Sequence, residues 1–285
     1  MADDDHGAQS GRVRLIVNAD DFGRSHSRNQ AIIQAHRQGI LTSASLMVGG
    51  QAFEEAVALA RANPRLGVGL HVTLVCGNAV LPHDRIPGLA DARGLFNDNA
   101  VRAGLDFFFR RPILPQLQAE IAAQFERFAQ TGLPLDHVNG HLNIHLHPAV
   151  FKVLMAHAGA SGFKNFRLTR DWFWMNARMT SGQWLYRTSH ALIFTLLSRY
   201  ARPVLRRANI SHTRAVFGLL QNARVTEEYL LGLLPRLPAG DFELYSHPCL
   251  EEAPEELAAL ISPKVMDQMR TLGIQVIRYQ DLSYV

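Results

Sequence analysis

The hydrophobic pattern of the first seventy residues alternates between short apolar runs and longer segments with helical spacing. Residues 13–17 are apolar apart from Arg14 and rich in β-branched side chains, which is typical of a buried strand. Similar β-prone runs recur at 42–48 and 66–74, and helical periodicity fills the intervals at 24–37 and 51–62. This β-α-β-α-β order predicts a parallel sheet with crossover helices.

The later part of the chain predicts more helices and strands after a long loop. Residues 76–115 are rich in Gly, Pro, Asn and Asp, which predicts a loop that carries the aromatic and basic run 107–111. Helical periodicity predicts helices at 116–131, 148–157, 185–205, 226–237 and 255–272. Apolar runs predict short strands at 163–168, at 242–245, at 274–277 and one ending at Phe217. We therefore expect a disordered lead at 1–12 and a single α/β domain with mostly parallel strands at 13–285.

Composition describes a globular chain without a membrane span. Of the 285 residues, 47% are hydrophobic and 19% are charged. No apolar stretch approaches the ~18–20 residues that a spanning helix needs. The amino-terminal residues lack the basic and apolar regions of a signal peptide. Cys76 and Cys249 lie far apart, and neither has metal-ligand spacing. We expect a cytoplasmic protein without a disulfide framework.

Positive charge is concentrated in one part of the chain. Residues 164–214 contain ten Lys or Arg and one acid, Asp171. Within it, the segment 170–207 carries three tryptophans and a series of leucines and arginines at roughly helical spacing. Such a segment fits an anionic partner, and we expect peripheral contact with the inner membrane through 170–207 and no binding of nucleic acid. The alternatives are a solvated basic face and core packing of the leucines. The pattern is compatible with a monomer or an oligomer.

Two adjacent carboxylates, Asp20 and Asp21, follow the first apolar run. Parallel α/β folds place their active sites at the carboxyl ends of the strands. Adjacent acids repel each other, so either a cation between them or one protonated carboxyl group would explain the pair. Both side chains can reach one site only where the strand breaks, and we expect Gly23 to supply that break. The alternative is a solvated turn with a helix N-cap.

Histidines follow other predicted strands. His71 lies at the outer end of the third strand, His141 and His145 follow a later one, and His247 follows the strand at 242–245. Each has an ordinary alternative: a satisfied core histidine, a solvated His-rich loop or a turn residue. Together with the paired acids they give an Asp-His-His set at one edge of a parallel sheet. That set suits a divalent ion such as Zn²⁺, with positions left open for water and substrate.

Four motifs together resemble the YdjC-like carbohydrate deacetylases: NADDFG near the amino terminus, GLHVTL, the HxxxH segment and a late SHP. The similarity extends from Val13 nearly to Asp281. It implies a distorted (β/α) barrel, one divalent metal ion and removal of acetyl groups from N-acetylglucosamine-type sugars. The ion is expected to be Zn²⁺, with Mg²⁺ as the alternative.

The resemblance also implies roles for individual residues. Asp21, His71 and His141 match the metal ligands of the family. Asp20 matches the general base that takes a proton from water. His247 is similar to the histidine that protonates the leaving amine. Acetate and a free amine would be the products.

One departure concerns the substrate. Family members that act on chitin-derived disaccharides typically read Asp-Ser-His-His-His-x-His where this chain reads NGHLNIH, so a carboxylate becomes Asn139 and a histidine becomes Leu142. The chain is more similar to the branch associated with hopanoid biosynthesis, which implies an N-acetylglucosaminyl hopanoid lipid, a glycolipid, as substrate. Asn139 and His145 are expected beside the ligands without binding the ion.

Other functions fit parts of this pattern. A deacetylase of chitooligosaccharides would use the same residues on a different substrate. A metal-dependent phosphoesterase could use the same Asp and His chemistry, although two-metal sites normally draw on more carboxylates. A non-catalytic carbohydrate- or nucleic-acid-binding protein would explain the basic segment, but it would leave the acids and histidines at the strand ends unexplained.

Overall fold

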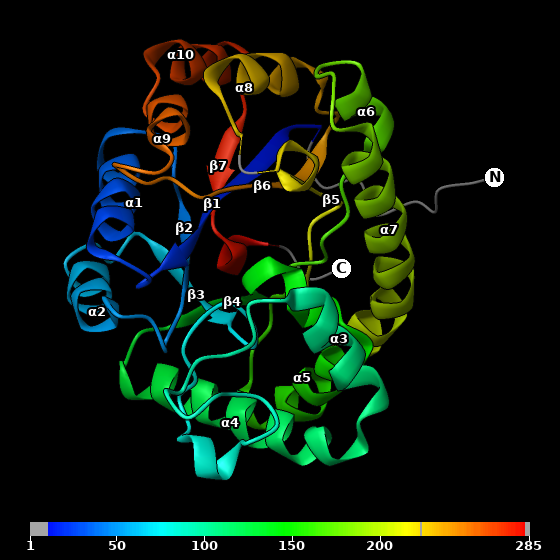
Figure 1. Cartoon of the computed structure of the whole chain (residues 1–285). Helices are drawn as coiled ribbons and strands as arrows, with labels where there is room; N and C mark the ends of the chain where they lie inside the picture. Colours follow the sequence, from blue (N-terminus) through cyan, green and yellow to red (C-terminus); the bar gives the residue numbers. More distant parts are fainter. Residues whose placement is uncertain (1–10, 223, 283–285) are drawn as a thin grey trace.

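The strands form one parallel sheet that curls into a distorted barrel (Figure 1). The computed structural model describes residues 11–222 and 224–282, so most of the lead expected at 1–12 lies outside the described residues. The strand order is β4-β3-β2-β1-β6-β5, and β7 pairs with the first half of β1. The strands are β1 (Val13–Phe22), β2 (Ser43–Leu46), β3 (Gly67–Val72), β4 (Leu135–Gly140), β5 (Ala215–Phe217), β6 (Gly240–Ser246) and β7 (Gln275–Ile277).

An irregular segment spans the gap between the two edge strands, β4 and β5. Val138 of β4 pairs with Phe166, and Asn165 pairs with Ser211 just before β5. Further along, the Val216 amide donates to the Arg170 carbonyl over 3.0 Å. The continuous strand expected at 163–168 is therefore wrong, because this segment makes only single-residue bridges to each neighbour. It still closes the curled sheet, which confirms the expected distorted barrel.

Helices pack around the outside of the sheet (Figure 1). They are α1 (His26–Gln38), α2 (Phe53–Arg61), α3 (Ala100–Phe109), α4 (Leu114–Gln130), α5 (Pro148–Ser161), α6 (Phe173–Ala177), α7 (Trp184–Arg207), α8 (Glu227–Leu233), α9 (Pro254–Leu260) and α10 (Pro263–Thr271). Because helices cover the outer face and side chains fill the interior, the central strands are buried on both sides. Leu15, Ile16 and Val17 of β1 have no exposed surface, which explains their uninterrupted apolar run.

Two expectations about helices are wrong. The loop expected at 76–115 contains α3, whose first turn is capped by Asn99: its side chain accepts a hydrogen bond from the Arg102 amide. The single helix expected at 255–272 is two helices, α9 and α10. Ser262 caps the second one and Pro263 begins it, because proline has no amide to continue the preceding helix.

Two further expectations concern the membrane and the cysteines. Among the described residues, no helix has the length and apolar character needed to cross a bilayer. Cys76 and Cys249 are both free thiols, as expected from their separation in the sequence.

Candidate active site

The two carboxylates lie in a distorted part of β1. The strand continues past Val17 through both acids to Phe22, and its register against β2 shifts between Ala19 and Phe22. Asp21 has φ +67°, in the left-handed region. The distortion therefore begins at Asp21, and Gly23, with φ +89°, follows the last residue of the strand. A bulge of this kind re-aims consecutive side chains, and it lets both buried carboxylates face the same end of the barrel.

Asp21, His71 and His141 meet at the carboxyl ends of β1, β3 and β4. The Asp21 Oδ1 atom lies 2.9 Å from His141 Nδ1 and 3.4 Å from His71 Nε2. All three side chains are buried, and their ligand-type atoms lie within 4.8 Å of one another. The other Asp21 oxygen accepts a hydrogen bond from Arg24 Nη1 over 2.9 Å. Parallel strand ends thus place these side chains together, although the residues are far apart in sequence.

Asn139 fixes the orientation of the His71 ring. Its Oδ1 atom lies 2.7 Å from His71 Nδ1 and accepts the proton carried there. The Nε2 atom, which lies on the Asp21 side of the ring, is therefore the His71 nitrogen left to bind a metal ion. The Asn139 amide nitrogen donates to Ser45 Oγ over 2.8 Å and lies 3.4 Å from Asp20 Oδ1. Asn139 thus connects a candidate ligand to the second carboxylate without itself joining the ligand set.

Asp20 is held in a two-pronged ion pair with Arg167. Arg167 Nη1 lies 2.7 Å from Asp20 Oδ2, and Nη2 lies 2.9 Å from Oδ1. Asn18 also donates to Asp20 Oδ1 over 2.9 Å. Burial alone would raise the pKa of Asp20, but the Arg167 guanidinium, together with His71 and His247, holds that pKa well below its usual range. Asp20 is therefore an ionised hydrogen-bond acceptor at neutral pH.

Arg167 was not among the residues predicted from the sequence. It is fully buried, and its Nε atom donates to Glu243 of β6 over 2.8 Å. Its guanidinium carbon lies 4.5 Å from the centre of the Tyr245 ring. Arg167 and Glu243 are charged side chains inside the predicted strands 163–168 and 242–245, and that was the signal that could have marked each of them as buried and in need of a partner. Buried arginines and glutamates need charged partners.

His247 lies just beyond the end of β6, on the open side of the site. Its Nε2 atom is 4.0 Å from Asp20 Oδ2, and its side chain is 26% exposed. Its backbone amide donates to Glu256, which fixes the turn after Ser246. The position lets the imidazole reach a bound molecule that also lies beside Asp20.

His145 is buried behind the site, outside the ligand set. Its Nε2 atom donates to the Arg167 carbonyl over 3.0 Å. Burial and the nearby Arg167 charge lower the pKa of His145 to about 3, so its ring is neutral. The segment that separates it from His141 is a kinked 3₁₀ turn, in which Leu142 and Asn143 have positive φ. The two histidines therefore do not share one face of a continuous helix.

The donor set of Asp21, His71 and His141 could hold a metal ion. A zinc ion bonds histidine nitrogen and carboxylate oxygen at ~2.0–2.2 Å in tetrahedral geometry, which sets ligand atoms roughly 3.4 Å apart. The 3.4 Å between His71 Nε2 and Asp21 Oδ1 equals this spacing, whereas the 2.9 Å between His141 Nδ1 and Asp21 Oδ1 is shorter. Burial opposes the charge on Asp21, but neighbouring histidines, His141 above all, hold the pKa of Asp21 well below its usual range. Three protein ligands leave positions open for water and substrate, as in catalytic centres.

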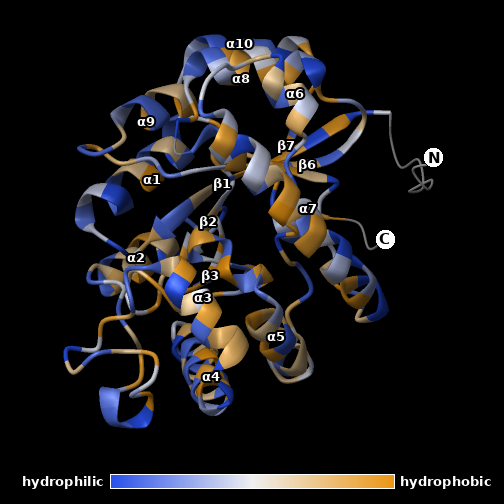
Figure 2. Cartoon of the chain, turned by 45° about the vertical axis from the view of Figure 1, so that its right-hand side comes forward, coloured by the Kyte–Doolittle hydropathy of each residue, from blue (hydrophilic) through white to orange (hydrophobic). Residues whose placement is uncertain are grey.

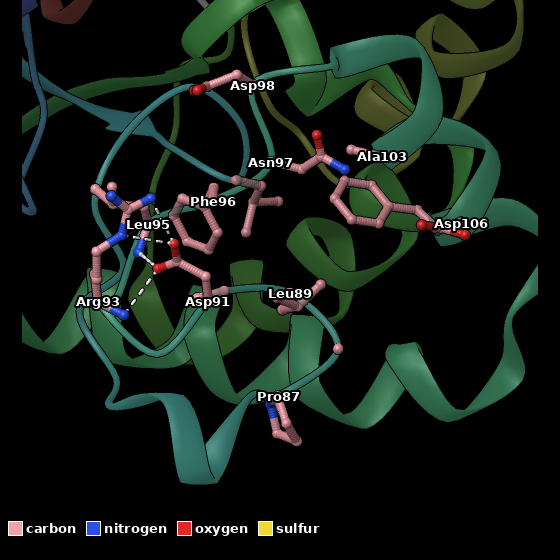
Figure 3. Close-up of a pocket in the computed structure, with 14 residues that line it drawn as sticks. Pro87, Leu89, Asp91, Arg93, Leu95, Phe96, Asn97, Asp98, Ala103 and Asp106 are labelled. Atoms are coloured by element: carbon pink, nitrogen blue, oxygen red, sulfur yellow. Dashed lines mark hydrogen bonds and ion pairs between the residues drawn. The ribbon is translucent and has the colours of Figure 1, made fainter.

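A separate cavity of about 370 Å³ lies beneath the loop that precedes α3 (Figure 3). Its lining includes Leu89, Phe96 and Phe107, and the ion pair of Arg93 with Asp91 at 3.0 Å lies on one side of it. None of the residues that line it belongs to the Asp-His-His set. The candidate active site is therefore the strand-end cluster and not this cavity.

Residues 14–271 match the family model described as "YdjC-like protein". A protein of Geobacillus stearothermophilus named carbohydrate deacetylase is 30% identical over 93% of this chain and 96% of its own length. A Brevibacillus brevis protein of the same name is 42% identical over 50% of the chain, and a Proteus mirabilis chitooligosaccharide deacetylase is 36% identical over 49%. The latter two matches span about half of those relatives, 54% and 53%.

A solved structure has the same fold. It is a protein of Enterococcus faecalis V583, provisionally described as a cellobiose-phosphate cleavage protein. It matches with a TM-score of 0.74 at 24% identity, over 95% of this chain and 99% of its own. At this identity the likeness concerns the fold alone.

Proposed function

The chain belongs to the YdjC-like protein family, and on that premise we propose that it removes the acetyl group from an N-acetylated amino sugar by metal-assisted hydrolysis. The observation that carries the proposal is the meeting of Asp21, His71 and His141 at one end of the barrel, with Asp20 and His247 beside them. The names of the Brevibacillus and Geobacillus relatives support a carbohydrate deacetylase.

Amide hydrolysis needs an activated carbonyl, an activated water and a proton for the departing nitrogen. A divalent ion bound by Asp21, His71 and His141 would supply Lewis acidity, which polarises a carbonyl oxygen and acidifies water. Asp20 is the proposed general base. Its contacts with Arg167 hold it ionised and in one orientation. Its Oδ1 atom also accepts a hydrogen bond from Asn18, so the second lone pair of Oδ2 is the one left for a water proton.

His247 is the proposed general acid. Its Nε2 atom faces the same Asp20 oxygen from the open side of the site. A sugar whose acetyl group lies at the Asp-His-His set would place its amide nitrogen between these two groups. His247 would then hand a proton to the departing nitrogen while Asp20 holds the proton taken from water. Acetate and a free amine result.

Zn²⁺ is the proposed ion, and Mg²⁺ is the alternative. Two imidazole nitrogens and one carboxylate form a mixed nitrogen and oxygen set, which Zn²⁺ accepts readily. Mg²⁺ prefers six oxygen ligands in octahedral geometry. The two histidines therefore favour zinc.

The proposed specific substrate is an N-acetylglucosaminyl lipid of the hopanoid type. Leu142, next to the candidate ligand His141, is an exposed apolar residue where the family's chitin-specific members carry a histidine. An apolar side chain at this position suits a lipid-linked sugar better than a free oligosaccharide. The second candidate is a chitooligosaccharide, which the name of the Proteus mirabilis relative supports.

Release of acetate tests the function. Purified protein with added Zn²⁺ should release acetate and a primary amine in equal amounts from an N-acetylglucosaminyl lipid, and more slowly from N-acetylated chitooligosaccharides. Release of phosphate from phosphoesters, with no acetate from any acetylated sugar, would identify a phosphoesterase instead. Faster turnover of the oligosaccharide would reverse the order of the two substrates.

Loss of either histidine ligand should empty the site. His71→Ala and His141→Ala each remove one of three protein ligands, so we expect elemental analysis of the purified variants to find the metal lost. His83→Ala is the matched control, because His83 lies outside the site and its Nδ1 atom bonds the Ala90 carbonyl. If both site variants keep full metal occupancy, the ligand assignment is wrong.

A further inference from the structure

Helix α7 presents apolar side chains to solvent. Leu185, Leu192 and Leu196 lie within about 40° of one another on the helix surface, and Leu185 is 84% exposed. The opposite side of the helix packs on the barrel through Ala201 and Leu205. Core packing is therefore wrong for these three leucines, whereas Leu197 and Leu205 of the same helix do pack on the core. Figure 2 shows hydrophobic residues along the length of α7.

Helix α3 repeats the arrangement. Phe107 is buried, whereas the next two residues, Phe108 and Phe109, are 62% and 71% exposed. Val101 and Leu105 of the same helix are also exposed. An apolar outer face on a surface helix is costly in water, so its presence on two helices indicates a partner.

Both helices lie beside the turn that carries the candidate ligand His141. The Phe108 ring of α3 lies 6.3 Å from the ring of His147, at the end of this turn. Helix α7 contacts the turn directly, and its Ser198 donates to the Thr169 carbonyl over 2.9 Å. Leu142, in the same turn, is exposed. Helices α3 and α7 therefore lie beside the turn that carries His141, at the end of the barrel where the candidate site lies.

The charges around these faces are positive. Helix α7 contains no acidic residue, and Arg199, Arg206 and Arg207 are exposed along it. Arg110 and Arg111 follow α3 and are also exposed, and Arg110 lies 3.7 Å from Asp106. Helices that lie in an anionic lipid interface typically combine leucine and phenylalanine on one face with arginine beside them.

We propose that α3 and α7 together dock on an anionic lipid surface and hold the mouth of the active site against it. A second copy of the chain is a poorer occupant, because it would bring the arginines of two α7 helices together. Nucleic acid would match the arginines but would leave the leucines in water. The inference rests on the proposed function in one respect: docking would give the active site access to a lipid-linked amino sugar in the membrane.

Vesicle co-sedimentation tests the docking surface. The wild-type protein should bind vesicles of phosphatidylcholine and phosphatidylglycerol, and bind less to phosphatidylcholine alone or at high salt. The triple variant Leu185→Ser, Leu192→Ser, Leu196→Ser and the double variant Phe108→Ser, Phe109→Ser should each lower partitioning by at least about 10-fold. Arg199→Gln, Arg206→Gln, Arg207→Gln should lower it by about 100-fold at low salt.

The control is Leu272→Ser, Val276→Ser, which removes exposed apolar side chains outside both helices and should bind as the wild type does. Thermal unfolding shows that each variant is folded, and all should release acetate from a soluble acetylated sugar at the wild-type rate. Absence of binding to either kind of vesicle would overturn the proposal. So would a wild-type dimer that the triple variant turns into a monomer. Absence of acetate release with vesicle binding kept would instead count against the proposed function.

Discussion

Asp20→Asn should keep its metal ion and lose turnover by about 10²–10⁴-fold, which is the usual contribution of a general base. The substitution keeps the size of the side chain and one acceptor oxygen but removes its basicity. Asp20 lies outside the Asp-His-His set, where Arg167 and Asn18 hold it. Asp21→Asn should have the opposite order of effects: the metal is bound more weakly, and activity falls as a consequence.

Metal content and acetate release are measured together on both variants. The matched control is Asp241→Asn, since Asp241 is also a carboxylate paired with an arginine, Arg14, but at the amino end of β6. Its turnover should stay at the wild-type level. If Asp20→Asn loses the metal while Asp21→Asn retains it, the two carboxylates have exchanged roles.

Arg167→Met should lower the free energy of unfolding by about 3–5 kcal/mol. Arg167 is fully buried between Asp20 and Glu243, and both carboxylates lose their charged partner when it is removed. Methionine has similar length but no charge, so most of the effect comes from the two unpaired acids. Chemical denaturation at neutral pH measures the change. The control is Arg199→Met, on the exposed face of α7, which should change the free energy of unfolding by less than about 0.5 kcal/mol.

The destabilisation should depend on pH. In the wild type the pKa of Asp20 is lowered, so its ion pair contributes stability above the unfolded pKa of about 3.9 and loses it as the pH falls through the folded pKa. In the variant, burial without Arg167 raises the Asp20 pKa. Protonation as the pH falls then removes the unpaired buried charge and the destabilisation that it causes. The difference in the free energy of unfolding between wild type and variant should therefore become smaller from pH 8 to pH 4. A gap of constant size would show that lost packing, and not charge, is responsible.

Much of the fold could be predicted because its strands carry their own signal. β1 and β6 are buried on both faces, so each appears as an apolar run, and the order of strands and helices then requires a parallel sheet. Helix α3 was missed because its signals are weak: a glycine lies inside it, and the exposed Phe108 and Phe109 disturb the amphipathic pattern. The split between α9 and α10 could have been found from Ser262 and Pro263, which are a typical helix start.

The strand-end side chains of the site were predictable for the same reason. Asp21, His71 and His141 are polar residues at the ends of β-prone runs, and parallel strands bring their carboxyl ends together. Arg167 was not predicted, because its partners Asp20 and Glu243 lie on other strands. No local pattern pairs residues across a sheet. The positive φ of Asp21 was also beyond prediction, since aspartate adopts it far less often than glycine.

Stepwise return of metal to the chelated protein tests the central claim most directly. Zn²⁺ is removed with a chelator and added back in small portions, and acetate release from an N-acetylated glucosamine conjugate is followed at each step. We expect no release without metal, a rise in proportion to added ion, and a plateau at one ion per chain. His71→Ala should not recover under the same additions. Full acetate release from the chelated protein, or a plateau at two ions per chain, would contradict a single metal centre at Asp21, His71 and His141.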